Sequence, residues 1–273
     1  MRIGAPLPKQ VKDPKEWVYE HRRRGYRAAY CPGLTIHDTL EIQAYRQAAK
    51  EADLVIAEVG AWSNPLSGDE ATRRSALERC KEQLALADEI GAVCCVNIAG
   101  SRSAQWDGPH PDNFSTDTFS LIVDQVRDIL DAVKPKTSCY ALEMMPWIYP
   151  NNAETYLKLL KAIDRPSFGV HLDPVNIIAS PSLFFNNRDL LEECFRLLGP
   201  YIRSCHAKDI TLSSELTVHL GEVRPGLGGL DYHAYLMLLQ SLRRDVPLML
   251  EHLTGEEEYR EAFQFIFSTA SEI

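Results

Sequence analysis

The stretch ADEIGAVCCV, Ala87–Val96, contains a complete passage from a helix into a strand. It begins at the end of an amphipathic segment in which Leu77, Leu84 and Ala87 share one helical face. Gly91 follows, and glycine readily adopts the left-handed conformation that ends a helix. The run AVCCV is apolar without alternation, which is typical of a parallel strand covered on both faces. The stretch therefore predicts helices packed against a buried parallel sheet.

The same order of helix, glycine and strand recurs in RRRGYRAAYC (Arg22–Cys31) and FRLLGPYIRSC (Phe195–Cys205). Eight short apolar runs alternate with amphipathic segments, and this pattern in 273 residues is typical of an α/β protein with a (β/α)8 TIM barrel. A doubly wound open sheet is the alternative. No linker or shift in composition divides the chain, so we expect a single domain over residues 1–273. The predicted strands are Arg2–Ala5, Tyr26–Cys31, Leu54–Val59, Ala92–Ile98, Ser138–Met144, Ser167–Leu172, Ile202–Ala207 and Pro247–Glu251.

Capping residues set the limits of the predicted helices. Asp13 precedes a proline at the first helical position, and Gly25 ends that helix. Ser67 and Glu70 form a capping-box pattern before the helix that leads to Gly91. The remaining predicted helices are Phe119–Val133, a helix capped by Asn152 that runs through Leu160, Arg188–Leu198, a helix capped by Asp231 that runs through Leu242, and Glu256–Ile273.

The composition excludes several classes of protein. Apolar residues make up 45% and charged residues 25% of the chain, as in ordinary globular proteins. The net charge of −9 repels phosphate backbones, so we expect no nucleic-acid partner. No segment is apolar enough for a signal peptide or a membrane span. The seven cysteines include no CxxC pair, and several lie in apolar runs, which predicts buried free thiols and a cytoplasmic location.

Side chains of the kind that bind metals occur at the ends of four consecutive predicted strands. They are Glu143 in CYALEMMPW, Asp173 in FGVHLDPVN, His206 in RSCHAKD and Glu251 in PLMLEHL. The carboxyl ends of barrel strands meet at one rim, where a divalent cation would compensate several buried carboxylates. Each residue alone fits a salt bridge or a hydrogen-bonded core position, but the four together favour a metal site. Oxygen ligands with one nitrogen suit Mn²⁺, Mg²⁺, Co²⁺ or Zn²⁺.

Two other patterns leave alternatives open. GLGGLDY, Gly226–Tyr232, has three glycines but lacks the preceding strand and the lysine of a phosphate-binding loop, so we expect a loop over the rim. Trp62, Trp106 and Trp147 each follow a predicted strand, where they either form the wall of a sugar pocket or cover the barrel rim.

The segments ALEMMP, GVHLDPVN, CHAKD, GLGGLDY and LMLEHL, in this order, resemble the xylose-isomerase-like TIM-barrel superfamily of sugar isomerases and epimerases. The resemblance covers nearly the whole chain. It implies one divalent metal ion, with Mn²⁺ expected first, held by Glu143, Asp173, His206 and Glu251. In ketose 3-epimerases of this kind, the residues matching Glu143 and Glu251 are also the catalytic acid and base, and the proton moves through a metal-stabilised enediolate. The expected activity is therefore that of a metal-dependent isomerase or epimerase in carbohydrate metabolism, with a small carbohydrate as substrate; homo-oligomers are common in the superfamily.

The sequence departs from this pattern at one position. Many members carry histidine three residues after the metal-binding aspartate, whereas Asn176 stands there in this chain. Asparagine can hydrogen-bond a sugar hydroxyl but cannot carry a proton at neutral pH. We expect Asn176 and Trp106 to contact substrate. For His171 the alternatives are substrate contact and a place in the barrel interior, and for Lys208 and Arg224 they are substrate contact and a surface salt bridge.

Three other functions remain as alternatives. A metal-dependent lyase or hydrolase, such as a dehydratase of a cyclic polyol, would use the same metal and an enolate. An apurinic-endonuclease-like enzyme would need a larger cluster of three metals and a basic groove, which the net charge of −9 argues against. A non-catalytic sugar-binding protein would need neither a metal nor the two glutamates.

Overall fold

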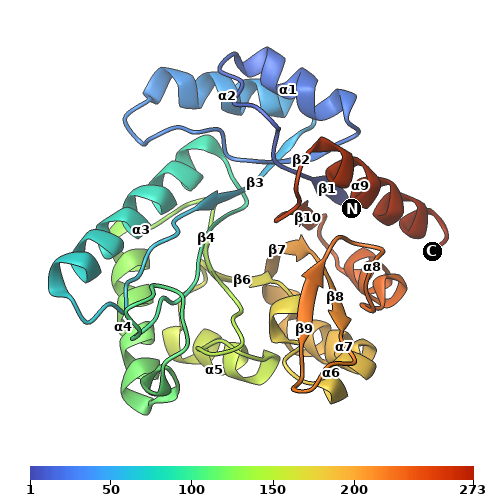
Figure 1. Cartoon of the computed structure of the whole chain (residues 1–273). Coiled ribbons are helices and arrows are strands. Elements are labelled where there is room, and N and C mark those ends of the chain that lie inside the picture. Colours follow the sequence, from blue (N-terminus) through green and yellow to red (C-terminus); the bar gives the residue numbers. More distant parts are fainter.

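The eight predicted strands form one closed parallel barrel, which confirms the predicted fold class. The computed structural model describes residues 1–273. Around the barrel the strands follow the order β1-β10-β7-β6-β5-β4-β3-β2, so barrel strands that are consecutive along the chain pair side by side. Figure 1 shows the helices arranged as an outer ring around these strands. The barrel strands are β1 (Arg2–Gly4), β2 (Ala28–Tyr30), β3 (Val55–Gly60), β4 (Cys94–Asn97), β5 (Tyr140–Glu143), β6 (Phe168–Leu172), β7 (Ile202–Ala207) and β10 (Pro247–Leu250).

The helices of the outer ring bury their apolar faces against the barrel. A core of 60 buried residues includes apolar side chains from both layers. Three short 3-10 turns, at Pro111–Phe114, Val175–Ile177 and Gly199–Tyr201, occur in the connections. The helices are α1 (Pro14–Arg23), α2 (Thr39–Glu51), α3 (Glu70–Ile90), α4 (Thr116–Val133), α5 (Ala153–Ile163), α6 (Pro181–Phe185), α7 (Asn187–Leu198), α8 (Tyr232–Ser241) and α9 (Glu256–Ser271).

Most of the predicted helix caps are confirmed. The side chains of Asp13, Asn152 and Asp231 each accept a hydrogen bond from a backbone N–H in the first turn that follows. Gly91 ends α3 with a φ of 80°, in the left-handed region. The capping box at Ser67 is wrong, because α3 begins two residues later and Asp69 accepts the backbone N–H of Thr72 at 2.8 Å.

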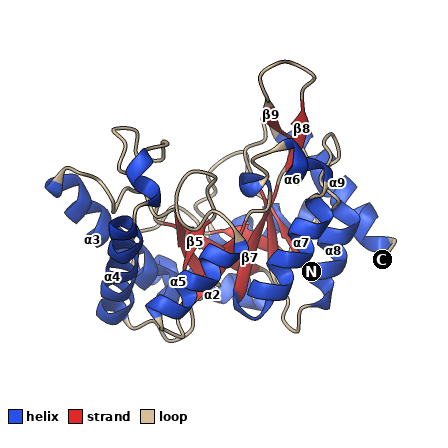
Figure 2. Ribbon diagram, turned by 90° about the horizontal axis from the view of Figure 1, so that it is seen from below, coloured by secondary structure: helices blue, strands red, loops and turns tan.

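Helices α2 and α6 and strands β8 and β9 were not predicted. Helix α2 buries only Ile42, Tyr45 and Ala49, and its N-cap makes no side-chain hydrogen bond, so it gives a weak signal in the sequence. Strands β8 (Asp209–Leu212) and β9 (Leu220–Val223) form an antiparallel hairpin outside the barrel sheet. Figure 2 shows this hairpin projecting beyond the other strands at one end of the barrel. That end carries the loops that follow the barrel strands.

Small residues line part of the barrel interior. Cys94, Val96, Cys139 and Ala141 form a buried cluster separate from the main core. Cys139, just before β5, and Ala141 and Glu143 on β5 are spaced two residues apart, so their side chains share one face of the sheet. All seven cysteines are free, and six are buried, as predicted. No helix is both long and apolar enough to cross a lipid bilayer.

Candidate metal centre

Four side chains of the kind that bind metals meet at the carboxyl ends of adjacent strands. Glu143 ends β5, Asp173 follows β6, His206 lies near the end of β7 and Glu251 follows β10. Each contributes one ligand atom, and these four atoms all lie within 4.8 Å of one another. The four side chains are buried or nearly so. The structure therefore brings together the four residues that the sequence places at strand ends.

The orientation of His206 creates a demand for positive charge. Its Nδ1 lies 2.8 Å from Glu251 Oε1, 3.4 Å from Glu143 Oε1 and 3.6 Å from Asp173 Oδ2. None of Nδ1, Asp173 Oδ2 and Glu251 Oε1 makes a hydrogen bond of acceptable geometry, although all three are buried. The lone pair of a neutral imidazole is repelled by carboxylate oxygens, so this arrangement needs either a proton on Nδ1 or a cation between these atoms. A divalent metal ion fits this set of donors.

Lys208 lies within the same cluster. Its Nζ is 2.8 Å from Asp173 Oδ2 and 2.6 Å from Glu251 Oε1, and the residue is 3% exposed. Of the two alternatives for Lys208, a surface salt bridge is wrong, because this ion pair is buried, and contact with substrate remains a prediction. The acidic partners raise the pKa of Lys208 above its ordinary value, even though burial opposes this, so the ammonium stays charged.

The pKa shifts show how strongly the carboxylates of this cluster depend on cations. Burial raises the pKa of Glu143. Burial would also raise the pKa values of Asp173 and Glu251, but Lys208 and His206 hold both below their ordinary range. Burial would lower the pKa of His206, and the surrounding carboxylates raise it instead. The cluster therefore contains more negative charge than Lys208 alone compensates.

Glu58 was missed by the sequence analysis. It lies on β3 and is 2% exposed, with Oε1 at 3.3 Å from His206 Nε2 and Oε2 at 3.5 Å from His171 Nδ1. A carboxylate that accepts the Nε2 proton leaves Nδ1 free to bind a metal. Glu58 escaped prediction because it stands within its strand, whereas the predicted metal-binding residues stand at strand ends. The available signal was a single acidic residue within the apolar run VIAEVG.

His171 lies in the barrel interior, which agrees with one of its two alternatives. Its ring is fully buried, and its Nδ1 makes a hydrogen bond with the hydroxyl of Ser204. The His171 ring packs edge-on against His206, with centroids 4.1 Å apart. Burial and the neighbouring His206 lower the pKa of His171, so its imidazole is neutral. Its contacts are those of a residue that supports His206.

Asn176 lies beside the cluster and contacts a carboxylate. Its Nδ2 donates to Glu143 Oε1 at 2.9 Å and to the carbonyl of Met144 at 3.1 Å. Its Oδ1 accepts from Lys208 Nζ at 3.3 Å. The amide therefore holds Glu143 in place, and the expected contact with substrate remains a prediction.

Two of the expected substrate-binding residues lie outside the cluster. Arg224 Nη2 pairs with Glu261 Oε2 on α9 at 3.0 Å. Trp106 is 39% exposed and lines a different hollow, together with Trp62 and Arg79. The structure does not bring either Arg224 or Trp106 to the four side chains of the candidate metal centre.

Asp209 organises the loop that contains GLGGLDY. Its Oδ2 accepts the backbone N–H groups of Gly226 and Gly228, both at 3.0 Å, and its Oδ1 accepts that of Leu230 at 2.9 Å. A side chain at Gly228 would collide with this carboxylate. The N–H groups that a phosphate-binding loop would offer to a ligand are thus directed at Asp209. This agrees with the expected loop next to the rim.

The hairpin contributes acidic and titratable groups beside the cluster. Glu222 on β9 accepts from His252 Nδ1 at 3.1 Å, and its Oε2 lies 3.8 Å from Lys208 Nζ. The hydrogen bond with Glu222 raises the pKa of His252. Both side chains are partly exposed, in contrast to the buried cluster. They therefore lie between the buried cluster and solvent.

A parallel barrel with a buried carboxylate–histidine cluster at its C-terminal rim defines the general class of this protein. The chain belongs to the xylose isomerase-like TIM barrel family, whose model matches residues 25–269. No curated protein sequence matches this chain.

Similar solved structures have different activities. The 3-keto-D-glucoside 4-epimerase YcjR from E. coli has 16% identity and a TM-score of 0.72, with 98% of this chain and 99% of that one covered. The probable 3-DHS dehydratase AsbF from Bacillus anthracis has 17% identity and a TM-score of 0.72, with coverage of 98% and 99%. Endonuclease IV from Thermus thermophilus has 14% identity and a TM-score of 0.75, with both chains covered completely. At these identities the likeness establishes the fold and does not select one activity.

Proposed function

We propose that this chain is a divalent-metal-dependent isomerase or epimerase of a sugar or sugar derivative. The observation that carries the proposal is the convergence of Glu143, Asp173, His206 and Glu251, whose ligand atoms all lie within 4.8 Å of one another. The epimerase among the similar structures supports the carbohydrate class of substrate. The donor set favours Mn²⁺ or Mg²⁺ over softer metals, and Mn²⁺ is our first expectation.

Glu143 and Glu251 are proposed to move the proton. They come from β5 and β10, which are separated around the barrel by β6 and β7. Two carboxylates that approach from different strands can serve two faces of one substrate carbon, which is what inversion or proton transfer requires. When bound, the metal would polarise the substrate carbonyl and make the neighbouring C–H more acidic. Asn176 holds Glu143 in position, and Lys208 compensates Asp173 and Glu251.

Glu58 and His171 are proposed to support the centre from below. Glu58 fixes the tautomer of His206, and His171 supports the ring of His206 from the side. Neither side chain is exposed enough to touch a substrate. They are therefore positioning residues.

A panel of ketoses, aldoses and sugar acids incubated in D₂O with Mn²⁺-loaded protein tests this function. We expect deuterium to enter the carbon next to the carbonyl of at least one sugar, without loss of water from the product. Glu143→Gln and Glu251→Gln should each slow this exchange by about 100-fold or more. Glu154→Gln, an exposed position on α5, is the matched control and should exchange at the wild-type rate.

Each other outcome points to another function. Elimination of water from the sugar would assign the chain to the dehydratase type. Retention on DNA at physiological salt would revive the endonuclease alternative. Absence of bound metal, together with unchanged sugar binding in both glutamine variants, would favour a non-catalytic sugar-binding protein.

A further inference from the structure

A second cavity lies at the opposite end of the barrel from the metal centre. It has a volume of about 830 Å³. The residues that line it lie at the beginnings of strands β3–β7 and at the ends of helices α2 and α3. Such a volume suits a small organic ligand. In barrels of this fold, residues on the N-terminal face ordinarily contribute to stability. A cavity lined by charged side chains is not needed for that role.

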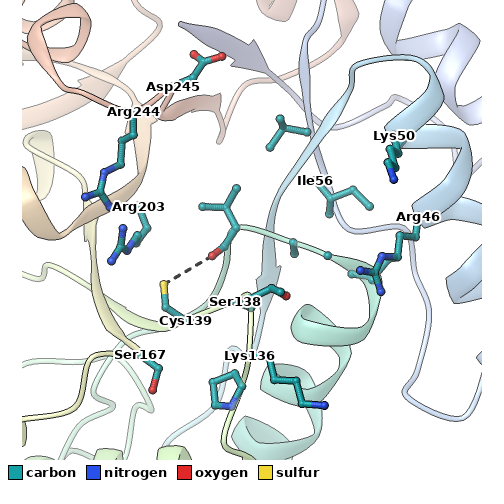
Figure 3. A pocket seen from close by; sticks show the side chains of 18 of the residues that line it. Arg46, Lys50, Ile56, Lys136, Ser138, Cys139, Ser167, Arg203, Arg244 and Asp245 are labelled. Atoms are coloured by element: carbon teal, nitrogen blue, oxygen red, sulfur yellow. Dashed lines mark hydrogen bonds between the residues drawn. The ribbon is translucent and has the colours of Figure 1, made fainter.

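Five basic side chains surround this cavity, although the chain as a whole has a net charge of −9. Figure 3 shows Arg203 and Arg244 on one side of it, Arg46 and Lys50 on the other, and Lys136 between them at the lower edge. None of the five takes part in an ion pair, although acidic residues outnumber basic ones by 38 to 29 in the sequence. Uncompensated cations that face one cavity repel one another, and a bound anion would relieve that repulsion.

The carboxylates nearest to the cavity are already engaged. Asp245 is its one acidic lining residue, and it pairs with the amino group of Met1 at 3.1 Å and with Arg2 Nε at 2.6 Å. Asp88 on α3 accepts the backbone N–H groups of residues 136, 137 and 138 at 2.7–3.0 Å. The basic residues therefore have no acidic partner within the chain.

Arg203 is directed toward this cavity by a local irregularity of the sheet. The pairing of β6 with β7 shifts register here, since Val170 pairs with Ile202 and His171 with Ser204, which leaves Arg203 as the extra residue of a bulge. A Cβ atom at Gly169 would lie 2.6 Å from Arg203 Cγ, so glycine makes room for the arginine stem. The partly buried guanidinium is thus held at the cavity by the backbone of two strands.

A buried hydroxyl next to the cavity has no partner within the chain. Ser138 lines the cavity at the start of the run that leads into β5 and is 6% exposed. Its Oγ has no hydrogen-bond partner. A buried hydroxyl without a partner costs free energy in a native structure.

Capping of helix C-termini explains only part of this arrangement. Arg46 Nη1 donates to the carbonyl of Glu89, and Arg244 Nη2 donates to that of Pro200. Each contact uses one of the five N–H donors of an arginine. Lys50 and Lys136 make no such contact, and the bulge that directs Arg203 serves no helix end.

We propose that this cavity binds a small anion that carries two or more phosphoryl groups. Guanidinium groups match phosphoryl oxygens with paired N–H donors, and lysines add point charge. Basic groups on several sides of the cavity favour a ligand with separated negative charges over a single phosphate. The site is independent of the reaction proposed at the metal centre.

Titration calorimetry at low salt with inorganic phosphate and with fructose 1,6-bisphosphate tests this site. The wild type should bind the bisphosphate in a 1:1 complex and more tightly than phosphate. Lys50→Gln combined with Lys136→Gln removes two exposed charges without touching the core, and should weaken binding by about 10-fold or more. Arg203→Gln should weaken it at least as much.

Two control variants make the outcome decisive. Lys15→Gln combined with Lys158→Gln removes the same charge from exposed positions on α1 and α5 outside the cavity, and should leave the affinity unchanged. An equal loss in this control would overturn the proposal in favour of diffuse electrostatic attraction. Loss of binding in Asp173→Asn, with wild-type affinity in the Lys50/Lys136 variant, would place the ligand at the metal centre and also overturn it. Failure of the wild type to bind the bisphosphate would do the same.

Discussion

His206 has two nitrogens with opposite tasks. Nδ1 faces the three carboxylates at the rim, and Nε2 faces Glu58 within the barrel. The four residues at strand ends were predictable because residue type and strand position are both visible in the sequence. Glu58 and the contact between Asn176 and Glu143 were not, because they depend on which side chains meet across the barrel. For Arg224 the sequence left substrate contact and a salt bridge as alternatives, because its pairing with Glu261 depends on the packing of α9, which the sequence does not reveal.

The contact between Glu58 and His206 predicts a loss of metal affinity in Glu58→Gln. The amide retains the shape of the side chain but removes the charge that fixes the His206 tautomer, so affinity for Mn²⁺ should fall by about 10-fold. Competition with a metal-sensitive dye measures this directly. At saturating Mn²⁺ the variant should recover most of its activity, which a Glu143→Gln variant should not. Unchanged affinity, matching that of the exposed control Glu154→Gln, would show that Glu58 does not position His206.

Among the elements, the barrel strands and most helices could be predicted because continuous apolar runs and caps are local signals. The hairpin of β8 and β9 could not, since it packs outside the barrel sheet and most of its residues are only partly buried. Helix α2 has too small a buried face to stand out. The position of the α3 cap shifted because Ser67 and Asp69 are both good capping residues, and only the path of the chain selects Asp69.

The role of Asp209 predicts the effect of Asp209→Asn on its loop. An amide directs N–H groups at the backbone donors of Gly226, Gly228 and Leu230, so at least one of them loses its acceptor. We expect stability to fall by about 2 kcal/mol. Hydrogen exchange should accelerate within residues 225–230, while the barrel strands remain protected. Unchanged exchange in this loop would contradict the role assigned to Asp209.

For the molecule as a whole, the barrel separates two kinds of charge. The C-terminal rim carries buried carboxylates around Lys208 and His206, and the N-terminal face carries basic side chains around a cavity. The overall charge of −9 could be counted from the sequence, but this separation could not, because it depends on which end of the barrel each residue occupies. Folding thus concentrates carboxylates at the C-terminal end of the barrel and basic side chains at the N-terminal end.

The free energy of unfolding should depend on Lys208, and more strongly when no metal is bound. Lys208→Met keeps the length of the side chain but leaves Asp173 and Glu251 without their buried ammonium, so metal-free protein should lose about 3 kcal/mol in urea unfolding. Saturating Mn²⁺ should narrow this gap, because the metal compensates the same carboxylates. The exposed control Lys158→Met should behave as the wild type does. An equal loss with and without Mn²⁺ would separate Lys208 from the metal site.

Diffraction from Mn²⁺-soaked crystals at the manganese absorption edge tests the central claim most directly. The account predicts one strong anomalous peak, bonded to Glu143, Asp173, His206 Nδ1 and Glu251, and its disappearance in His206→Ala crystals that keep the barrel. A structure without an anomalous peak among these four side chains, or with the peak at another set of residues, would contradict it.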